Sequence, residues 1–183
     1  DNFDAGTSGS GWSATLSHSD ASVNYAFDYS TIGVPSAPNS TGGSTIGMSF
    51  LANQSAGVQQ GISASPTGYS FTGDFRIRFD MWLNYVASGD GSTQVGSFGW
   101  GTSGASAQWA GSSSSIMFGG STDGGSSFDY RLYRNNALVT TAASYAAGSL
   151  NNSVTYYTTR YGGSAVPAAQ VLAFPSQTGA VSP

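Results

Sequence analysis

Apolar and polar side chains alternate along much of this chain, whereas apolar residues at helical spacing are almost absent. Residues 75–83 are the clearest case: every second residue is apolar, and Arg76, Arg78 and Asp80 lie between them. Successive side chains of a strand point to opposite faces of the sheet. This alternation therefore predicts a half-buried strand whose charged outer face is solvated.

Weaker alternation recurs between glycine-rich turns, and the chain contains 26 glycines. It predicts further strands at residues 11–16, 23–29, 45–51, 57–63, 94–100, 115–118, 128–133, 154–160 and 170–174. The turns at residues 88–92 and 121–126 contain Asp-Gly pairs, which favour tight hairpins. We expect a short helical turn within residues 137–147, and a loop over residues 34–43 because prolines remove donors from a strand ladder.

Many short strands with no substantial helix between them predict an all-β fold. We expect a single domain over residues 1–183, built as an antiparallel two-sheet β-sandwich. Hydrophobic residues make up 39% and aromatic residues 13% of the chain, which is enough apolar surface to offset the entropy lost on folding.

Charged residues make up only 8% of the chain, as five arginines and nine aspartates with a net charge of −4. Without a basic run the chain cannot neutralise a row of phosphates, so nucleic acid and anionic membranes are set aside as partners. It lacks cysteine and has one histidine, His18, which we expect to lie exposed in a strand or turn. This excludes thiolate nucleophiles, disulfides and zinc sites of the usual His/Cys kind, and we expect no metal or cofactor.

The chain also contains several short sequence motifs that, in this order, resemble those of a known family. They are Asp1-Asn2-Phe3-Asp4, Gly11-Trp12, Phe71-Thr72-Gly73-Asp74-Phe75-Arg76, Phe79-Asp80-Met81-Trp82, Gly125-Ser126-Ser127-Phe128-Asp129-Tyr130-Arg131 and Val166-Pro167-Ala168-Ala169-Gln170. Together they resemble secreted bacterial β-sandwich proteins that are concanavalin A-like or laminin-G-like and often carry a PEP-CTERM sorting tail, which this chain lacks. The resemblance implies a concanavalin A-like jelly roll and a secreted, extracellular or cell-surface location.

Proteins of this kind continue with further strands after a phrase like Phe174-Pro175-Ser176-Gln177-Thr178-Gly179. The resemblance therefore implies that the sandwich is incomplete at its C-terminus. Either the chain is a fragment, or another chain supplies the missing pairing.

The resemblance also raises the question of catalysis, since concanavalin A-like glycoside hydrolases use a close pair of glutamates. This chain has no glutamate. Asp74 and Asp80 share one face of the predicted strand, but six residues at ~3.3 Å each separate them by about 20 Å, which is too far for a catalytic pair. A pair of aspartates from different strands stays open as an alternative, but we expect a protein that is not an enzyme.

Binding of a polysaccharide or glycan is better supported, because sugars present apolar C–H faces and hydroxyl edges to aromatic rings and amides. The candidate glycan-binding residues are Trp82, Trp100, Gln108, Trp109, Tyr130 and Asn135. The competing interpretation is that each tryptophan packs in the core and does not contact a ligand. Trp82 is the exception in pattern, because the alternation places it on the polar face of its strand. The alternative function is a self-assembling structural subunit of a filament, sheath or surface layer, joined through open sheet edges.

Three asparagines match the acceptor pattern for N-glycosylation: Asn39, Asn53 and Asn151. In a chain this rich in asparagine, serine and threonine, such matches also arise by chance. They are meaningful only if the source organism glycosylates its proteins.

Overall fold

The computed structural model describes residues 1–4, 8–40, 42–52, 54–55, 58–83, 95–101, 106–107, 111–121, 128–161, 164–165 and 180–181. Strands are the most frequent regular elements of the described residues, and the paired strands are antiparallel. The predicted all-β class is thus confirmed. The chain divides into two compact units, Asp1–Trp82 with Ala105–Gln108 (unit 1) and Leu83–Gly104 with Trp109–Pro183 (unit 2). The single domain and the jelly-roll sandwich stay predictions.

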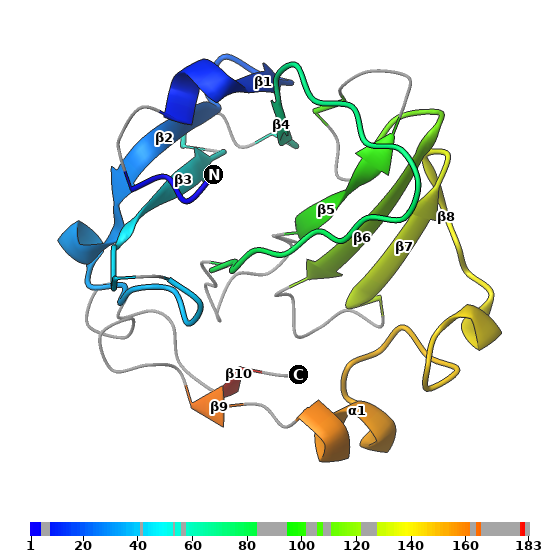
Figure 1. Ribbon diagram of the computed structural model, residues 1–183. Coiled ribbons are helices and arrows are strands. Elements are labelled where there is room, and N and C mark those ends of the chain that lie inside the picture. Colours follow the sequence, from blue (N-terminus) through cyan, green and yellow to red (C-terminus); the bar gives the residue numbers. More distant parts are fainter. Residues whose placement is uncertain are drawn as a thin grey trace. The chain divides into compact units, whose positions relative to one another are not determined.

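Unit 1 contains two antiparallel strand pairs, β1 with β4 and β2 with β3 (Figure 1). Its elements are the 3-10 turn η1 (Ser8–Gly11), β1 (Trp12–Leu16), β2 (Ser22–Asp28), the 3-10 turn η2 (Tyr29–Ile32), β3 (Ile46–Leu51) and β4 (Ile62–Pro66). Trp12 lies opposite Pro66 at the end of the β1–β4 pair. The β2–β3 register is irregular between Asn24 and Phe27.

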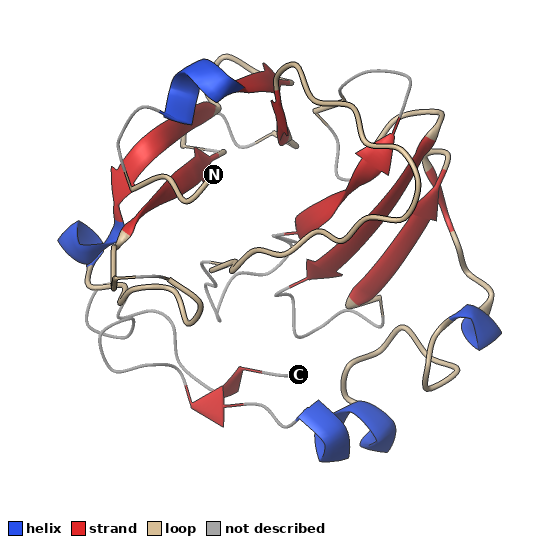
Figure 2. Cartoon of the chain, in the orientation of Figure 1, coloured by secondary structure: helices blue, strands red, loops and turns tan. Residues whose placement is uncertain are grey.

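Unit 2 is built on a four-stranded antiparallel sheet in the order β5-β6-β7-β8 (Figure 2). Its elements are β5 (Val95–Gly101), β6 (Ser115–Ser121), β7 (Tyr130–Arg134), β8 (Ala137–Leu138), the 3-10 turn η3 (Ala142–Ser144), the helix α1 (Thr155–Tyr161), β9 (Ser164–Ala165) and β10 (Ala180–Val181). The short strands β9 and β10 pair with each other.

The most buried apolar side chains of the described part of unit 2 connect its sheet to α1 and the preceding loop. Tyr133 of β7, Leu150 and Tyr157 of α1 are each exposed by 7% or less. The backbone N–H of Tyr130 donates to the Leu150 carbonyl at 3.0 Å, and the Tyr130 and Tyr157 rings meet edge to face at 4.9 Å between centroids. This packing fixes the end of β7 that is remote from the β7–β8 turn.

Most of the strands predicted from alternation are present in the described residues. The predictions at residues 11–16, 23–29, 45–51, 94–100, 115–118 and 128–133 correspond to β1, β2, β3, β5, β6 and β7. The prediction at 57–63 is displaced, because β4 runs from Ile62 to Pro66. The helical turn expected within 137–147 is η3, although β8 occupies the first two of those residues. The predictions at 170–174 and 88–92 lie outside the described residues.

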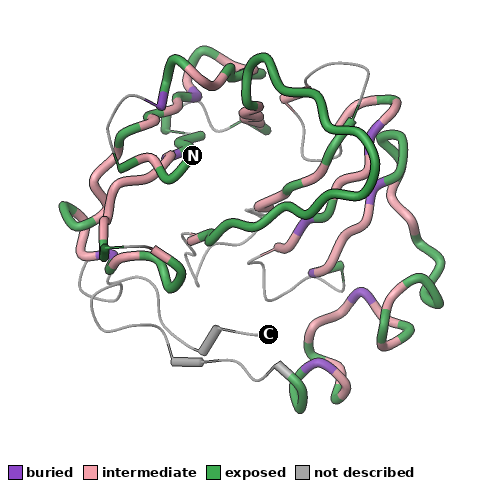
Figure 3. Tube along the Cα trace, viewed as in Figure 1, coloured by how far each residue is buried: buried purple, intermediate pink, exposed green. Residues whose placement is uncertain are grey.

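The strand predicted for the most strongly alternating segment, residues 75–83, is wrong. The structure describes all of these residues and has no strand there. Residues 66–81 are exposed throughout (Figure 3). Alternation shows that a segment can present two faces, but it does not supply the partner strand on which a ladder depends. Asp80, expected in a solvated charge ladder, instead accepts hydrogen bonds from the backbone N–H and side-chain Nδ2 of Asn39 at 2.9 and 2.7 Å.

The strand predicted at residues 154–160 is also wrong, because this segment forms α1. Its threonines and tyrosines favour strands in isolation, but their contacts here are helical. The Thr159 hydroxyl donates to the Thr155 carbonyl at 2.7 Å, and the Arg160 guanidinium lies 4.0 Å from the centre of the Tyr156 ring. The buried Tyr157 also donates its hydroxyl to the Ser149 carbonyl at 2.9 Å, so tertiary packing decides the conformation.

Candidate functional site

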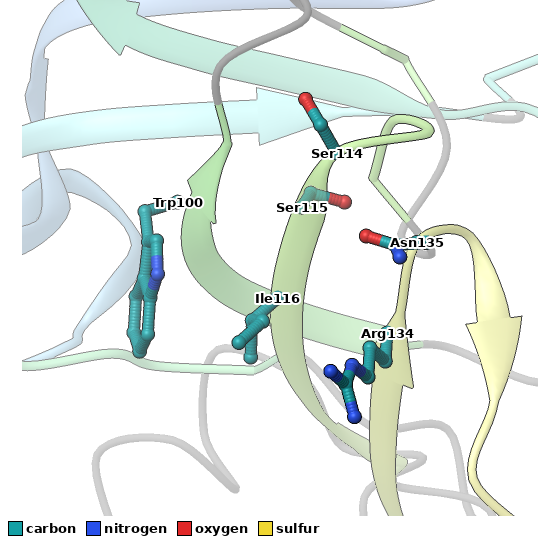
Figure 4. Close-up of a pocket in the computed structure, with 6 residues that line it drawn as sticks. All are labelled: Trp100, Ser114, Ser115, Ile116, Arg134 and Asn135. Atoms are coloured by element: carbon teal, nitrogen blue, oxygen red, sulfur yellow. The ribbon is translucent and has the colours of Figure 1, made fainter.

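Three neighbouring strands of unit 2 place an aromatic, an aliphatic and a cationic side chain in one row. Trp100 of β5 lies directly opposite Ile116 of β6, which lies opposite Arg134 of β7. Directly opposed residues of antiparallel strands point to the same face of the sheet. Figure 4 shows the three side chains next to one another on that face.

In β5, Trp100 is flanked by Gly99 and Gly101. A Cβ atom at Gly99 would collide with the backbone of Ile116 and with the side chain of Met117. At Gly101 it would come within 2.9 Å of Ser115 Cβ. Glycine at these two positions therefore permits the close approach of β5 to β6 that sets Trp100 beside Ile116.

Aromatic rings continue along the same face of the sheet. Phe98 is two residues before Trp100, and Phe118 lies opposite Phe98 at a centroid distance of 5.7 Å. Trp100 lies 6.4 Å from Phe118. The Trp100 side chain remains 44% exposed. Unit 2 thus presents a partly exposed aromatic strip with one tryptophan at its end.

A shallow, open pocket of about 350 Å³ lies at this end of the strip. Its lining residues are Trp100, Ser114, Ser115, Ile116, Arg134 and Asn135. Ser115 is 4% exposed, and its hydroxyl accepts from the Ser112 N–H and donates to the Ser112 carbonyl, at 2.9 and 2.7 Å. Ser115 therefore holds the β5–β6 side of the pocket in shape.

Asn135 also lines the pocket, and it belongs to the two-residue turn between β7 and β8. Asn135 and Asn136 both have positive φ angles, 52° and 64°, as a type I′ hairpin turn requires. Asparagine adopts this left-handed conformation more readily than most residues. The Asn135 N–H donates to the Ser115 carbonyl at 2.8 Å, which ties the turn to β6 and places an amide beside the pocket.

The structure brings together two of the predicted glycan-binding residues, Trp100 and Asn135. Gln108 and Trp109 lie outside the described residues. Tyr130 is on the same strand as Arg134, but four residues away, or about 13 Å at ~3.3 Å per residue, and its ring packs on Tyr157. Arg134 and Ile116 were not predicted from the sequence, because the β6–β7 register that aligns them is a property of the paired strands.

Trp82 is the fourth predicted residue within the described chain, and it belongs to unit 1. It is half-buried, and its ring lies edge-on to Tyr29 with the centroids 6.0 Å apart. Burial raises the pKa of the Tyr29 phenol, whose hydroxyl donates to the Met48 carbonyl at 2.9 Å. For Trp82, the geometry is that of a packed side chain.

The predicted glycosylation positions differ in their surroundings. Asn39 is exposed, and its Nδ2, the atom that would carry a glycan, donates to Asp80. Asn151 is half-buried, and its Oδ1 accepts from the Ser153 N–H at 2.7 Å. Asn53 lies outside the described residues. Modification at all three stays a prediction.

The single histidine belongs to a hydrogen-bonded turn in unit 1. The expectation that His18 lies exposed is wrong, because His18 is half-buried and its Nδ1 accepts from the Asp20 N–H at 3.0 Å. The Asp20 carboxylate accepts from the Ser55 hydroxyl at 2.7 Å and from Gln60 Nε2 at 3.0 Å. In a Ser-His-Asp triad the serine would donate to histidine and histidine to aspartate. Here the Asp20 N–H donates to His18, and the Ser55 hydroxyl donates to Asp20 and not to His18. These hydrogen bonds join two loops and do not form a catalytic triad.

Two further observations concern metal ions and membranes. Within the part of the chain that the structure describes, no three His, Cys, Asp or Glu residues gather closely enough to hold a metal ion. None of the helices found there is long and apolar enough to cross a membrane.

The chain matches no protein family, no curated protein and no solved structure in the comparisons made.

Proposed function

We propose that the chain is a non-catalytic extracellular module and that unit 2 binds a neutral polysaccharide at the Trp100 pocket. The observation that carries this proposal is the row formed by Trp100, Ile116 and Arg134, with Asn135 at its end. The exposed indole face suits the C–H face of a sugar ring. The guanidinium and the amide supply donors and an acceptor for its hydroxyl groups.

The shape and chemistry of the pocket support a chain-like ligand. Its volume of about 350 Å³ is at the small end of the ~300–1,000 Å³ range of ligand sites, and it is open to solvent. Because the pocket is open and Trp100 joins it to the aromatic strip of Phe98 and Phe118, a polymer has room to extend beyond it. A polysaccharide therefore suits the site better than a small enclosed ligand.

Affinity electrophoresis through gels containing laminarin, xylan, mannan or dextran tests this function. We expect at least one polysaccharide to retard the protein, and Trp100→Ala to weaken its binding about tenfold, or about 1.4 kcal/mol. Trp100→Phe is the matched control, because it keeps a planar ring, and it should retain most of the affinity. If Trp100→Ala binds as tightly as the unmodified protein, the site is wrong; if none of the polysaccharides retards the protein, the function is wrong.

The alternative function, self-assembly through open sheet edges, is favoured by the position of β5 at one edge of the described β5-β6-β7-β8 sheet. Multi-angle light scattering separates the two functions. The polysaccharide proposal predicts a monomer at micromolar concentration, whereas assembly predicts particles whose mass grows with concentration. Of the residues after Phe174, the structure describes Ala180–Val181, which pair with β9 of the same chain, and pairing with another chain stays a prediction.

A further inference from the structure

A second pocket lies entirely within unit 1. It has a volume of about 300 Å³ and is lined by Asp1, Gly11, Trp12, Pro66, Tyr69 and Phe71. Three of these six residues are aromatic, and one carries a carboxylate. This composition, apolar rings with a few polar groups, is that of a binding site for an organic ligand.

Local structure explains why these residues meet. Trp12 begins β1 and lies opposite Pro66, the last residue of β4, and the Thr67 N–H continues the ladder by donating to the Gly11 carbonyl at 2.9 Å. The chain then turns at Gly68, whose φ of 77° is in the left-handed region that glycine adopts without strain. This turn brings Tyr69 and Phe71 to the same pocket as Trp12.

Trp12 is held in place from two sides. Its Nε1 donates to Asp1 Oδ2 at 3.0 Å, and its ring packs on Phe3 with the centroids 5.7 Å apart. Asp1 Oδ1 accepts from the Phe3 N–H and the Ser8 hydroxyl, both at 2.9 Å. An indole fixed in this way loses little side-chain entropy when a ligand binds, which favours affinity.

Tyr69 and Phe71 form a stacked and accessible pair of rings. Their rings are nearly parallel, with an interplanar angle of 9° and a centroid distance of 6.3 Å. They are 70% and 62% exposed, the highest values among the large apolar side chains of the described residues. Exposing two such rings has a solvation cost that a stacked ligand would remove.

We propose that this pocket is a second saccharide-binding site, in which a neutral sugar ring stacks on Tyr69 and Phe71 beside Trp12. Asp1 accepts a hydrogen bond from a sugar hydroxyl there. The exposed face of an aromatic ring suits the C–H face of a pyranose, whereas an organic ammonium ion is best held by several rings that surround it. The proposal rests on the proposed function for its ligand class, and it makes the chain bivalent, with one site in each unit.

Bivalency has two measurable consequences. A polysaccharide long enough to reach both sites binds more tightly than either site alone would bind it. A trisaccharide too short to bridge them instead fills each site independently, so its stoichiometry counts the sites.

Calorimetric titration of the full chain with laminaritriose, xylotriose, mannotriose and isomaltotriose tests the proposal. We expect about two molecules of one trisaccharide per chain, about one in the Tyr69→Ala/Phe71→Ala variant, about one in Trp100→Ala, and none when the three substitutions are combined. Phe50→Ala, which removes an exposed ring of unit 1 outside both pockets, is the matched control and should keep about two.

The outcomes separate this inference from the proposed function. If the double variant keeps the stoichiometry of the unmodified chain while Trp100→Ala abolishes binding, the second site is wrong and the function stands. If Trp100→Ala has no effect while the double variant abolishes binding, the second site stands and the Trp100 site is wrong. Binding of tetramethylammonium at Tyr69 and Phe71 with no trisaccharide bound there would overturn the proposed ligand class.

Discussion

Asp28 shows how single aspartates organise loops in a chain that has few charges. Its Oδ1 accepts hydrogen bonds from the Ser30 N–H at 2.9 Å, the Ser30 hydroxyl at 2.7 Å and the Thr45 hydroxyl at 2.6 Å. These bonds, chiefly that from Thr45, hold the pKa of the Asp28 carboxyl below its ordinary value. The carboxylate caps η2 and joins it to the segment that precedes β3.

The lowered pKa of Asp28 predicts a pH dependence of stability. Because the folded protein favours the carboxylate, the stabilising contribution is present above the pKa of an unfolded aspartate, about 3.9, and is lost as the pH falls through the lower folded value. Thermal unfolding followed by circular dichroism between about pH 5 and pH 2 should show a smaller loss of Tm in Asp28→Asn than in the unmodified protein. Equal losses in the two proteins would contradict this role. Asp74→Asn, in an exposed segment, is the control.

At the scale of elements, the β7–β8 turn positions one side of the Trp100 pocket. Both of its residues have left-handed backbone conformations, and Asn135 contributes directly to the pocket. Asn136 does not line the pocket, so substitutions there test the turn separately from ligand contact.

We expect Asn136→Val to lower the free energy of unfolding by about 1–2 kcal/mol, because a β-branched residue is strained at positive φ. Asn136→Gly should leave this free energy within about 0.5 kcal/mol of the unmodified value, because glycine adopts the same conformation freely. Urea denaturation of the three proteins measures the difference. Equal stability of the valine and glycine variants would show that the turn has another conformation.

The positions of most strands could be predicted from alternation, because each local pattern there coincides with a ladder in the structure. The pattern failed at residues 75–83, where alternation occurs without a strand, and at 154–160, where burial of Tyr157 favours a helix. The site was predictable only in part. Trp100 and Asn135 were found by residue type, whereas Arg134 joins them through the register between the consecutive strands β6 and β7, which residue type alone does not give.

At the scale of the whole molecule, the low charge of the chain determines which polysaccharides suit it. The net charge is −4, and only five residues are cationic. A polyanion such as an acidic polysaccharide would be repelled by the molecule as a whole, although Arg134 could contact it locally. Stacking of a neutral sugar on Trp100 involves no long-range electrostatic interaction.

The account therefore predicts that affinity for the retained polysaccharide is nearly independent of salt. Raising NaCl from about 0.05 M to about 0.5 M should change the dissociation constant by less than about twofold, since charge screening has little to weaken. A steep loss of affinity over this range would indicate instead that Arg134 binds an anionic group. Isothermal titration at the two salt concentrations provides the measurement.

The most direct test is an NMR measurement of contact between the Trp100 indole and a bound sugar. With a trisaccharide of the retained polysaccharide, we expect intermolecular nuclear Overhauser effects between the indole ring protons of Trp100 and the C–H protons of one sugar face. Saturable binding of that trisaccharide with no such effects from Trp100, and unchanged affinity in Trp100→Ala, would contradict the central claim.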